Sequence, residues 1–209
     1  MPEPGPIRPK PVVTLFESYG SGAEYIGPRV AEALDLPYHQ QAFSSEELEQ
    51  EESEREKEGV LSRVLVAMGM STGEAGAGVP TAQQDRAELV KQNSLTVTEW
   101  AEQGGVIVGR NGAFILAGLA SALHVRLDGP VEQRIERAAG ERGITLERAA
   151  RRQKREDRVR VEMSRDLYGF DPADPLSYDL VLNTGRLDPD TCVAVIVAAV
   201  RIRAGLASP

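Results

Sequence analysis

The chain has 209 residues, of which 41% are hydrophobic and 27% are charged, and its formal net charge is −8. This length and composition predict one globular domain with a buried core rather than a disordered chain, and the negative charge argues against nucleic acid as a partner. The longest apolar run, residues 193–200, is too short to span a membrane, and the opening residues lack a signal-peptide core, so we expect a cytoplasmic protein without membrane contact.

The amino-terminal part of the chain predicts a tail, a strand and a helix. Residues 1–11 include five prolines and are expected to form a disordered tail, which places the folded domain at residues 12–205. Residues 12–16, VVTLF, predict a buried strand that breaks into a turn with two glycines. A helix tolerates proline cheaply only in its first turn, so we expect the next helix to begin at Gly27 or Pro28.

A short second strand or turn in LPYHQQAF is followed by a variable middle region, residues 44–82. Ser44 and Glu47 form a capping box for an acidic helix at residues 46–58, in which eight glutamates face only two basic residues. We interpret the acidic residues as a solvated helix face and the following GMSTGEAGAGVPTA as a flexible loop. The sequence assigns no role to this acidic helix.

The carboxyl-terminal part of the chain alternates helices with short strands. Helices are expected at about 83–103, in AFILAGLA, from Pro130 onward, at about 145–168 and at 189–203. Strands are expected in VIVG at 106–109, LHVRLDG at 123–129 and DLVLNT at 179–184. This alternation predicts a three-layer α/β domain, with a parallel sheet of about five strands, helices on both faces and ligands at the carboxyl ends of the strands.

Several segments, taken in chain order, carry a resemblance to a known family. They are the opening strand with YGSGAEYIG, LPYHQQAF, VIVGRNGAFIL, RLDGPVEQRIERAAGERGIT, and DRVR followed by DPADPLSYDLVLNT. Together they resemble the cytidylate-kinase-like branch of the P-loop nucleoside monophosphate kinases over nearly the whole chain. The resemblance implies a P-loop kinase fold and ATP-dependent phosphoryl transfer to a nucleoside monophosphate or similar small acceptor, with Mg²⁺ accompanying the ATP.

The resemblance also implies roles for individual residues. A glycine loop would hold the donor phosphates at a helix amino terminus, arginines would hold the acceptor, and a lid helix at 145–169 would close over the transferring group. The implied donor-binding residues are Gly20, Ser21, Gly22 and Glu24, the acceptor-binding residues are Arg110, Asn111 and Arg134, and the catalytic residues are Asp157, Arg158 and Arg160. Simpler alternatives stay open: Arg110 could pair with a carboxylate, Arg134 could be solvated, and the basic lid could be an ordinary surface helix.

The glycine loop departs from the full P-loop pattern GxxxxGK[ST]. Glu17 stands in place of the first glycine, Ala23 in place of the lysine and Glu24 in place of the hydroxyl residue, and Asn111 stands where typical cytidylate kinases carry an aspartate. Because the Glu24 carboxylate would repel a triphosphate, we expect weak ATP binding that Glu24→Arg tightens. Ala23→Lys should do so less reliably, since a late helix start would aim the new amine poorly.

Two functional hypotheses therefore stand side by side. The first is a kinase in which Arg110, Arg158 and Arg160 supply the positive charge that the loop lacks. The second is a degenerate kinase fold that binds a nucleotide or a protein partner without transfer. His39 and His124 have no partners at metal-ligand spacing, so we predict no protein-built metal site. The identity of the acceptor does not follow from the sequence, and a homo-oligomer stays open.

Overall fold

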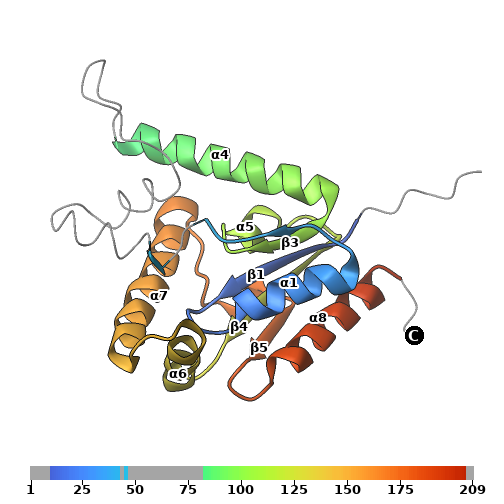
Figure 1. The fold of residues 1–209 in the computed structure, drawn as a ribbon. Helices are drawn as coiled ribbons and strands as arrows, with labels where there is room; N and C mark the ends of the chain where they lie inside the picture. The colour runs from blue at the N-terminus through green and yellow to red at the C-terminus, as the bar shows by residue number, and fades with distance from the viewer. Residues whose placement is uncertain (1–9, 43–44, 47–81, 206–209) are drawn as a thin grey trace, which may run out of the picture.

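A computed structural model of the chain describes residues 10–42, 45–46 and 82–205 (Figure 1). Its centre is a sheet of five parallel strands in the order β2-β3-β1-β4-β5. The strands are β1 (Val12–Glu17), β2 (Tyr38–His39), β3 (Gly105–Val108), β4 (Ala122–Asp128) and β5 (Leu180–Asn183). The predicted parallel sheet of about five strands is therefore confirmed.

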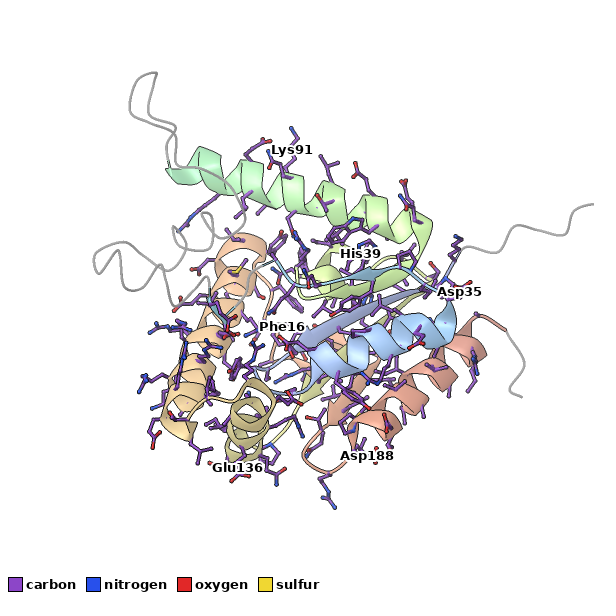
Figure 2. All side chains as sticks on the ribbon, in the orientation of Figure 1. Phe16, Asp35, His39, Lys91, Glu136 and Asp188 are labelled. Atoms are coloured by element: carbon purple, nitrogen blue, oxygen red, sulfur yellow. The ribbon has the colours of Figure 1, made fainter. Side chains whose placement is uncertain are left out.

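Helices cover both faces of this sheet, as the alternation of elements predicts. On one face lie α1 (Ala23–Leu34) and α8 (Pro189–Arg203), and on the other lie α4 (Ala82–Gln103) and the short α5 (Gly112–Ile115) (Figure 1). Each face has its own apolar core: Ile26, Val30, Ile196 and Val200 pack on the first, and Val97, Ala101 and Leu116 pack on the second. His39 lies beneath α4 (Figure 2). The result is a three-layer α/β architecture.

Two further helices cover the carboxyl end of the sheet. They are α6 (Val131–Arg142) and α7 (Leu146–Tyr168), which pack against each other (Figure 1). The Thr145 side chain accepts a hydrogen bond from the Arg148 N–H and caps the start of α7, and Gly169 ends that helix in a left-handed conformation with φ 62°. The structure thus places the predicted lid helix directly over the strand ends.

The expected late start of the first helix is wrong. Helix α1 begins at Ala23, immediately after Gly22, and Pro28 lies inside it. Proline there removes one helical hydrogen bond, to the carbonyl of Glu24. Burial of Ala23 and Ile26, which are 1% and 0% exposed, offsets that loss because both side chains enter the core against β1. The positive end of the α1 dipole therefore lies at the glycine loop after all.

Other differences are smaller. We expected a helix in AFILAGLA, but the observed helix contains only Gly112–Ile115, which begins one residue before that segment. The residues that follow Ile115 form turns. The expected capping box, the acidic helix at 46–58 and the glycine-rich loop lie almost entirely outside the described residues, as do residues 1–9 of the expected tail. Within the described part of the chain, no helix is both long enough and apolar enough to cross a membrane.

Candidate functional site

The glycine loop joins the carboxyl end of β1 to the amino terminus of α1. Gly20 and Gly22 have φ values of 77° and 87°, a conformation that glycine adopts far more readily than other residues. The loop closes on itself through the Ser21 N–H, which donates to the Ser18 carbonyl at 3.0 Å. The structure therefore brings Gly20, Ser21 and Gly22 together at a helix amino terminus, where backbone N–H groups favour anions.

Two arginines of α6 hold this loop from behind. Arg134 is 4% exposed and donates to the Tyr19 carbonyl at 2.8 Å and to the Gly129 carbonyl at 3.0 Å. Arg137 donates to the Gly20 carbonyl at 2.8 Å. Arg134 is thus a buried residue that supports the loop, and the structure does not bring it together with Arg110 and Asn111, the other predicted acceptor ligands.

Asp157 links the lid helix to the same loop. Its carboxylate accepts the Tyr19 N–H at 2.7 Å, pairs with Arg134 at 2.9 Å and accepts the Gln153 amide at 2.8 Å. One loop N–H therefore already has an anionic partner from within the chain. The family resemblance of the segment DRVR placed Asp157 in the site. Its contact with the loop could not be read from the sequence, because Tyr19 and Asp157 are 138 positions apart.

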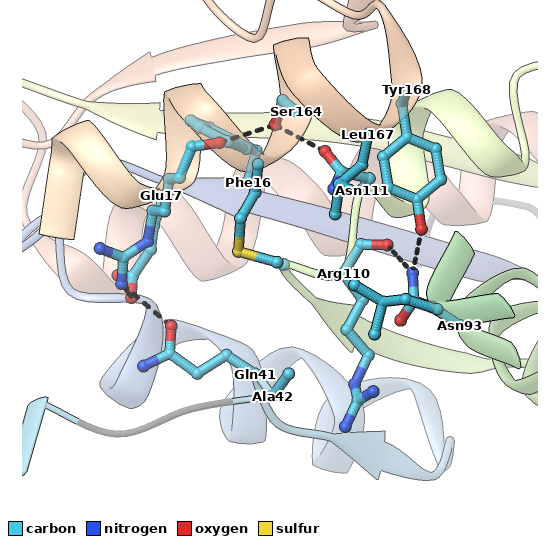
Figure 3. A pocket seen from close by; sticks show the side chains of 14 residues that line it. Phe16, Glu17, Gln41, Ala42, Asn93, Arg110, Asn111, Ser164, Leu167 and Tyr168 are labelled. Carbon is cyan, nitrogen blue, oxygen red and sulfur yellow. Dashed lines mark hydrogen bonds and ion pairs between the residues drawn. The ribbon is translucent and has the colours of Figure 1, made fainter. Parts of the chain in front are cut away.

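A buried carboxylate, Glu17, lies where the loop meets the sheet (Figure 3). Its Oε2 atom accepts the Ala23 N–H at 3.3 Å, and its Oε1 atom lies 3.4 Å from Arg160 Nη2. Burial raises the pKa of Glu17 from 4.5 to about 7; Arg160 opposes this rise, and the carboxylates of Glu156 and Glu24 add to it. Sequence reasoning treated Glu17 only as a missing glycine, although a glutamate at the end of a buried strand was a signal in itself.

Arg160 of the lid helix lies between two carboxylates, Glu156 of the same helix and Glu17 of β1. Its Nη1 atom is 3.2 Å from Glu156 Oε2, and its Nη2 atom donates to Gln41 Oε1 at 3.0 Å as well as facing Glu17. Burial alone would lower its pKa, but Glu156 and Glu17 outweigh that effect, so the pKa of Arg160 is raised. Arg158, the other predicted lid arginine, is exposed and lines none of the pockets described around the loop.

A pocket beside the loop contains Arg110 and Asn111 (Figure 3). Both residues follow β3 and have positive φ values, 53° and 55°, which is uncommon for residues other than glycine. The Asn111 side chain accepts from the Ser164 hydroxyl at 2.6 Å, and this contact ties the turn to α7. Five apolar side chains also line the pocket: Phe16, Ala42, Leu89, Met163 and Leu167.

The Arg110 guanidinium lies over an aromatic stack. Its carbon Cζ is 5.0 Å from the centre of the Trp100 ring, which stacks on His39 with ring centres 4.1 Å apart. Burial lowers the pKa of Arg110, and Tyr168 partly opposes that effect. Asn93, which sequence reasoning missed, donates to the Arg110 carbonyl at 2.9 Å and to the Tyr168 hydroxyl at 2.8 Å. The alternative that Arg110 pairs with a carboxylate has no support among the contacts between described residues.

Glu24 lies on the outer side of the loop. Its side chain is 61% exposed and forms an ion pair with Arg142 of α6. Exposed pairs of this kind contribute little stability. Glu24 nevertheless places a negative charge within the first turn of α1, beside the loop that was expected to receive the donor phosphates.

The described residues contain no cluster of three or more metal-ligating side chains. The carboxylates nearest the loop already have partners: Glu17 contacts Ala23 and Arg160, Asp157 contacts Tyr19 and Arg134, and Glu24 contacts Arg142. A Mg²⁺ ion that arrived with ATP would take most of its ligands from phosphate oxygens and water, as this ion commonly does. We therefore assign no residue as a metal ligand.

Comparison with known proteins gives matches in sequence. Residues 12–186 match the model of a family described as the cytidylate kinase-like family. The chain is 37% identical to a cytidylate kinase of Methanopyrus kandleri over 126 residues, which cover 56% of this chain and 65% of that protein. It is also 33% identical to a protein named uronate isomerase in Corynebacterium glutamicum over 132 residues, which cover 63% of this chain but only 25% of that protein.

Two solved structures resemble the fold. An uncharacterized protein from Eubacterium ventriosum superposes with a TM-score of 0.65 and 18% identity, covering 92% of this chain and 99% of that one. A sugar kinase from Janibacter sp. gives a TM-score of 0.51 and 17% identity, covering 96% of this chain and all of that one. At these identities the likeness concerns the fold, and it agrees with a three-layer P-loop kinase architecture.

Proposed function

Because the chain belongs to the cytidylate kinase-like family, we propose that it transfers a phosphoryl group from ATP to a nucleoside monophosphate or a similar small acceptor. The observation that carries this proposal is that two candidate binding sites adjoin each other. The glycine loop at the start of α1 and the Arg110 pocket lie at the same edge of the sheet, and Glu17 lines both. A donor and an acceptor bound there would face each other across the end of β1, the positioning on which phosphoryl transfer depends.

The donor site at the glycine loop and the acceptor site in the Arg110 pocket each contain groups that can bind phosphate or the acceptor. On the donor side, the loop N–H groups and the amino terminus of α1 would receive phosphate oxygens. On the acceptor side, Arg110 offers a planar guanidinium within a partly apolar pocket, and between the two sides Arg160 would face the charge that develops on the transferring group. Mg²⁺, when bound with ATP, would neutralise part of the donor phosphate charge. Helix α7 would act as the lid that carries Arg160.

A binding and turnover assay tests the proposal. Calorimetry with ATP and with each member of an acceptor panel (CMP, cytidine, neutral sugars and polyols), separately and together in the presence of magnesium, should show binding of ATP and of at least one acceptor. Chromatography should then show ADP and the phosphorylated form of that acceptor. Arg160→Lys keeps the charge but loses the planar fork, so we expect kcat to fall at least about 100-fold while the acceptor KM changes little. The matched control is Arg151→Lys, an exposed position on the same helix. Equal activity of both variants would remove Arg160 from the mechanism.

One observation favours a second function, that of a nucleotide-binding or protein-interaction module without transfer. The loop N–H groups of Tyr19 and Ala23 already donate to Asp157 and Glu17, so the chain's own carboxylates stand where donor phosphates would be expected. Under this alternative, calorimetry would show that ATP binds, and no compound of the acceptor panel would give a product over a prolonged incubation with excess protein.

A further inference from the structure

Glu17 borders more than one compartment of the site. Its side chain lines the Arg110 pocket and also the cavity at the glycine loop, which includes Gly20 and Gly22. The residue is only 7% exposed, and it also lines two further pockets at this edge of the sheet. A reactive group held by the acceptor side and a phosphate held by the donor side would therefore both lie next to the same carboxylate.

The contacts of that carboxylate are long. The Ala23 N–H lies 3.3 Å from Oε2, and Arg160 Nη2 lies 3.4 Å from Oε1, both beyond the usual range for hydrogen bonds of these types. Arg160 is shared with Glu156 at the shorter distance of 3.2 Å. Glu17 is thus a buried carboxylate that is incompletely neutralised, and it retains the capacity to accept another hydrogen bond.

The charge of the Arg110 pocket suits a neutral acceptor better than an anionic one. Among the described residues that line it, three are charged: Arg110 and Arg160 are positive and Glu17 is negative. Glu156 further neutralises Arg160. A phosphate monoester would bring close to two negative charges into a pocket whose three lining charges sum to about one positive unit, and to about zero once Glu156 is included. It would also lie beside the Glu17 carboxylate. A neutral compound would meet neither penalty.

The two classes of acceptor also differ in their need for a base. A phosphate acceptor presents an oxygen that is already anionic, whereas a hydroxyl group must lose its proton as the new bond forms. A carboxylate whose pKa burial raises to about 7 is matched to that task near neutral pH. The groups that face it are Arg160 and Glu156 of α7, the Ala23 N–H and the Glu24 carboxylate of α1, and the Tyr38 hydroxyl of β2.

We propose that the acceptor of this protein is a small neutral molecule that reacts through a hydroxyl group, and that Glu17 is its general base. This inference rests on the proposed kinase function and narrows its substrate class. The hydroxyl oxygen attacks the γ-phosphorus of ATP, and the bond from that phosphorus to the bridging oxygen breaks. ADP leaves with the bonding electrons, while the hydroxyl proton passes to Glu17 and then to water. The products are ADP, the phosphate ester and one proton.

Cytidine and CMP are the matched pair of probes, because they differ only in the 5′-phosphate. Wild-type protein with ATP and magnesium is assayed for ADP and for product with cytidine, with a panel of neutral sugars and polyols, and with CMP. We expect at least one neutral compound to be phosphorylated and CMP to be a poor acceptor. Turnover of CMP without turnover of any neutral compound would overturn this inference and leave the proposed function intact. If ADP formed but no compound, CMP included, were phosphorylated, both this inference and the proposed function would be overturned.

Variants at Glu17 test the base itself. Glu17→Gln keeps the shape of the side chain, so we expect ATP binding to persist while kcat for the neutral acceptor falls at least about 100-fold. Wild-type kcat should rise as the pH passes through about 7, and the variant should lose that rise. Glu17→Asp keeps a carboxylate and should recover part of the activity. If Glu17→Gln phosphorylated the neutral acceptor at the wild-type rate, Glu17 would not be the base. If wild-type turnover of CMP increased below pH 7, the acceptor would need Glu17 in its protonated form, and the inference would be overturned.

Discussion

Gly20→Ala is the substitution that tests the packing of the glycine loop most directly. Gly20 has φ 77°, and a Cβ atom added there would lie 2.3 Å from the carbonyl oxygen of Arg134. The left-handed conformation costs about 1–2 kcal/mol for a residue with a side chain. The overlap is with backbone and cannot be relieved by a rotamer change, so displacing the loop or α6 adds about 1–3 kcal/mol. We therefore expect a loss of about 2–5 kcal/mol.

Urea unfolding measures this loss, and two other glycines separate its parts. With a slope of about 2 kcal/mol per molar, the midpoint should fall by roughly 1–2.5 M. Gly22→Ala has φ 87° but its nearest new contact is at 3.8 Å, so only the backbone cost of about 1–2 kcal/mol should appear. Gly140→Ala, inside α6 with no atom within 4 Å of the new Cβ, should stabilise by up to about 1 kcal/mol.

The comparison of Gly20→Ala with Gly22→Ala tests whether the loop packs closely on the Arg134 backbone. If Gly20→Ala and Gly22→Ala lost the same stability, the close approach of the loop to the Arg134 backbone would be refuted. A functional readout runs in parallel: Gly20→Ala should weaken binding of a fluorescent ATP analogue because the loop has moved, and Gly140→Ala should leave that binding unchanged.

Three further outcomes are expected. Asp157→Ala removes the carboxylate 2.9 Å from the buried Arg134 guanidinium, so urea unfolding at pH 7 should show that the free energy of unfolding falls by about 3 kcal/mol. A fall of less than about 1 kcal/mol would mean that this pair does not hold the lid helix to the loop. Because the folded-state pKa of Glu17 is raised to about 7, the protonated carboxyl favours folding, and the stability of the wild-type protein relative to Glu17→Gln should fall by about 3 kcal/mol between pH 4.5 and pH 8. A stability difference that did not change with pH would contradict the raised pKa. Glu24→Arg removes the acidic charge at the start of α1 and places a second cation beside Arg142, so titration with an ATP analogue should show tighter binding; unchanged or weaker binding would argue against a phosphate site at this loop.

The architecture followed from signals that lie close together in the chain. Alternating apolar strands and helices predicted the parallel sheet and its two covered faces, and the glycines at the end of the first strand predicted the loop. Helix α8 has the predicted bounds, and α7 begins within one residue of the predicted start, because Thr145 caps it and Gly169 ends it locally. Such signals act within one or two turns and need no knowledge of the rest of the fold.

The start of α1 shows where a local rule loses to packing. Pro28 alone argued for a helix that begins late, yet Ala23 and Ile26 enter the core and keep the preceding turn helical. The burial of two apolar side chains outweighs one missing hydrogen bond. The expectation that a lysine at position 23 would be poorly aimed loses its basis, because that residue lies at the first turn of the helix.

By itself, the sequence determined the fold class, the family, the glycine loop and the arginine after β3, because each is carried by residues that are neighbours in the chain. Only the tertiary structure decided the chemistry at that edge of the sheet. It buried Glu17 against Ala23 and Arg160, joined Asp157 to the loop, placed Arg134 behind it and left Arg158 exposed. Apart from Ala23, which is 6 positions from Glu17, these partners come from elements more than a hundred positions apart. The burial that shifts the pKa of Glu17 exists only once those elements have packed together.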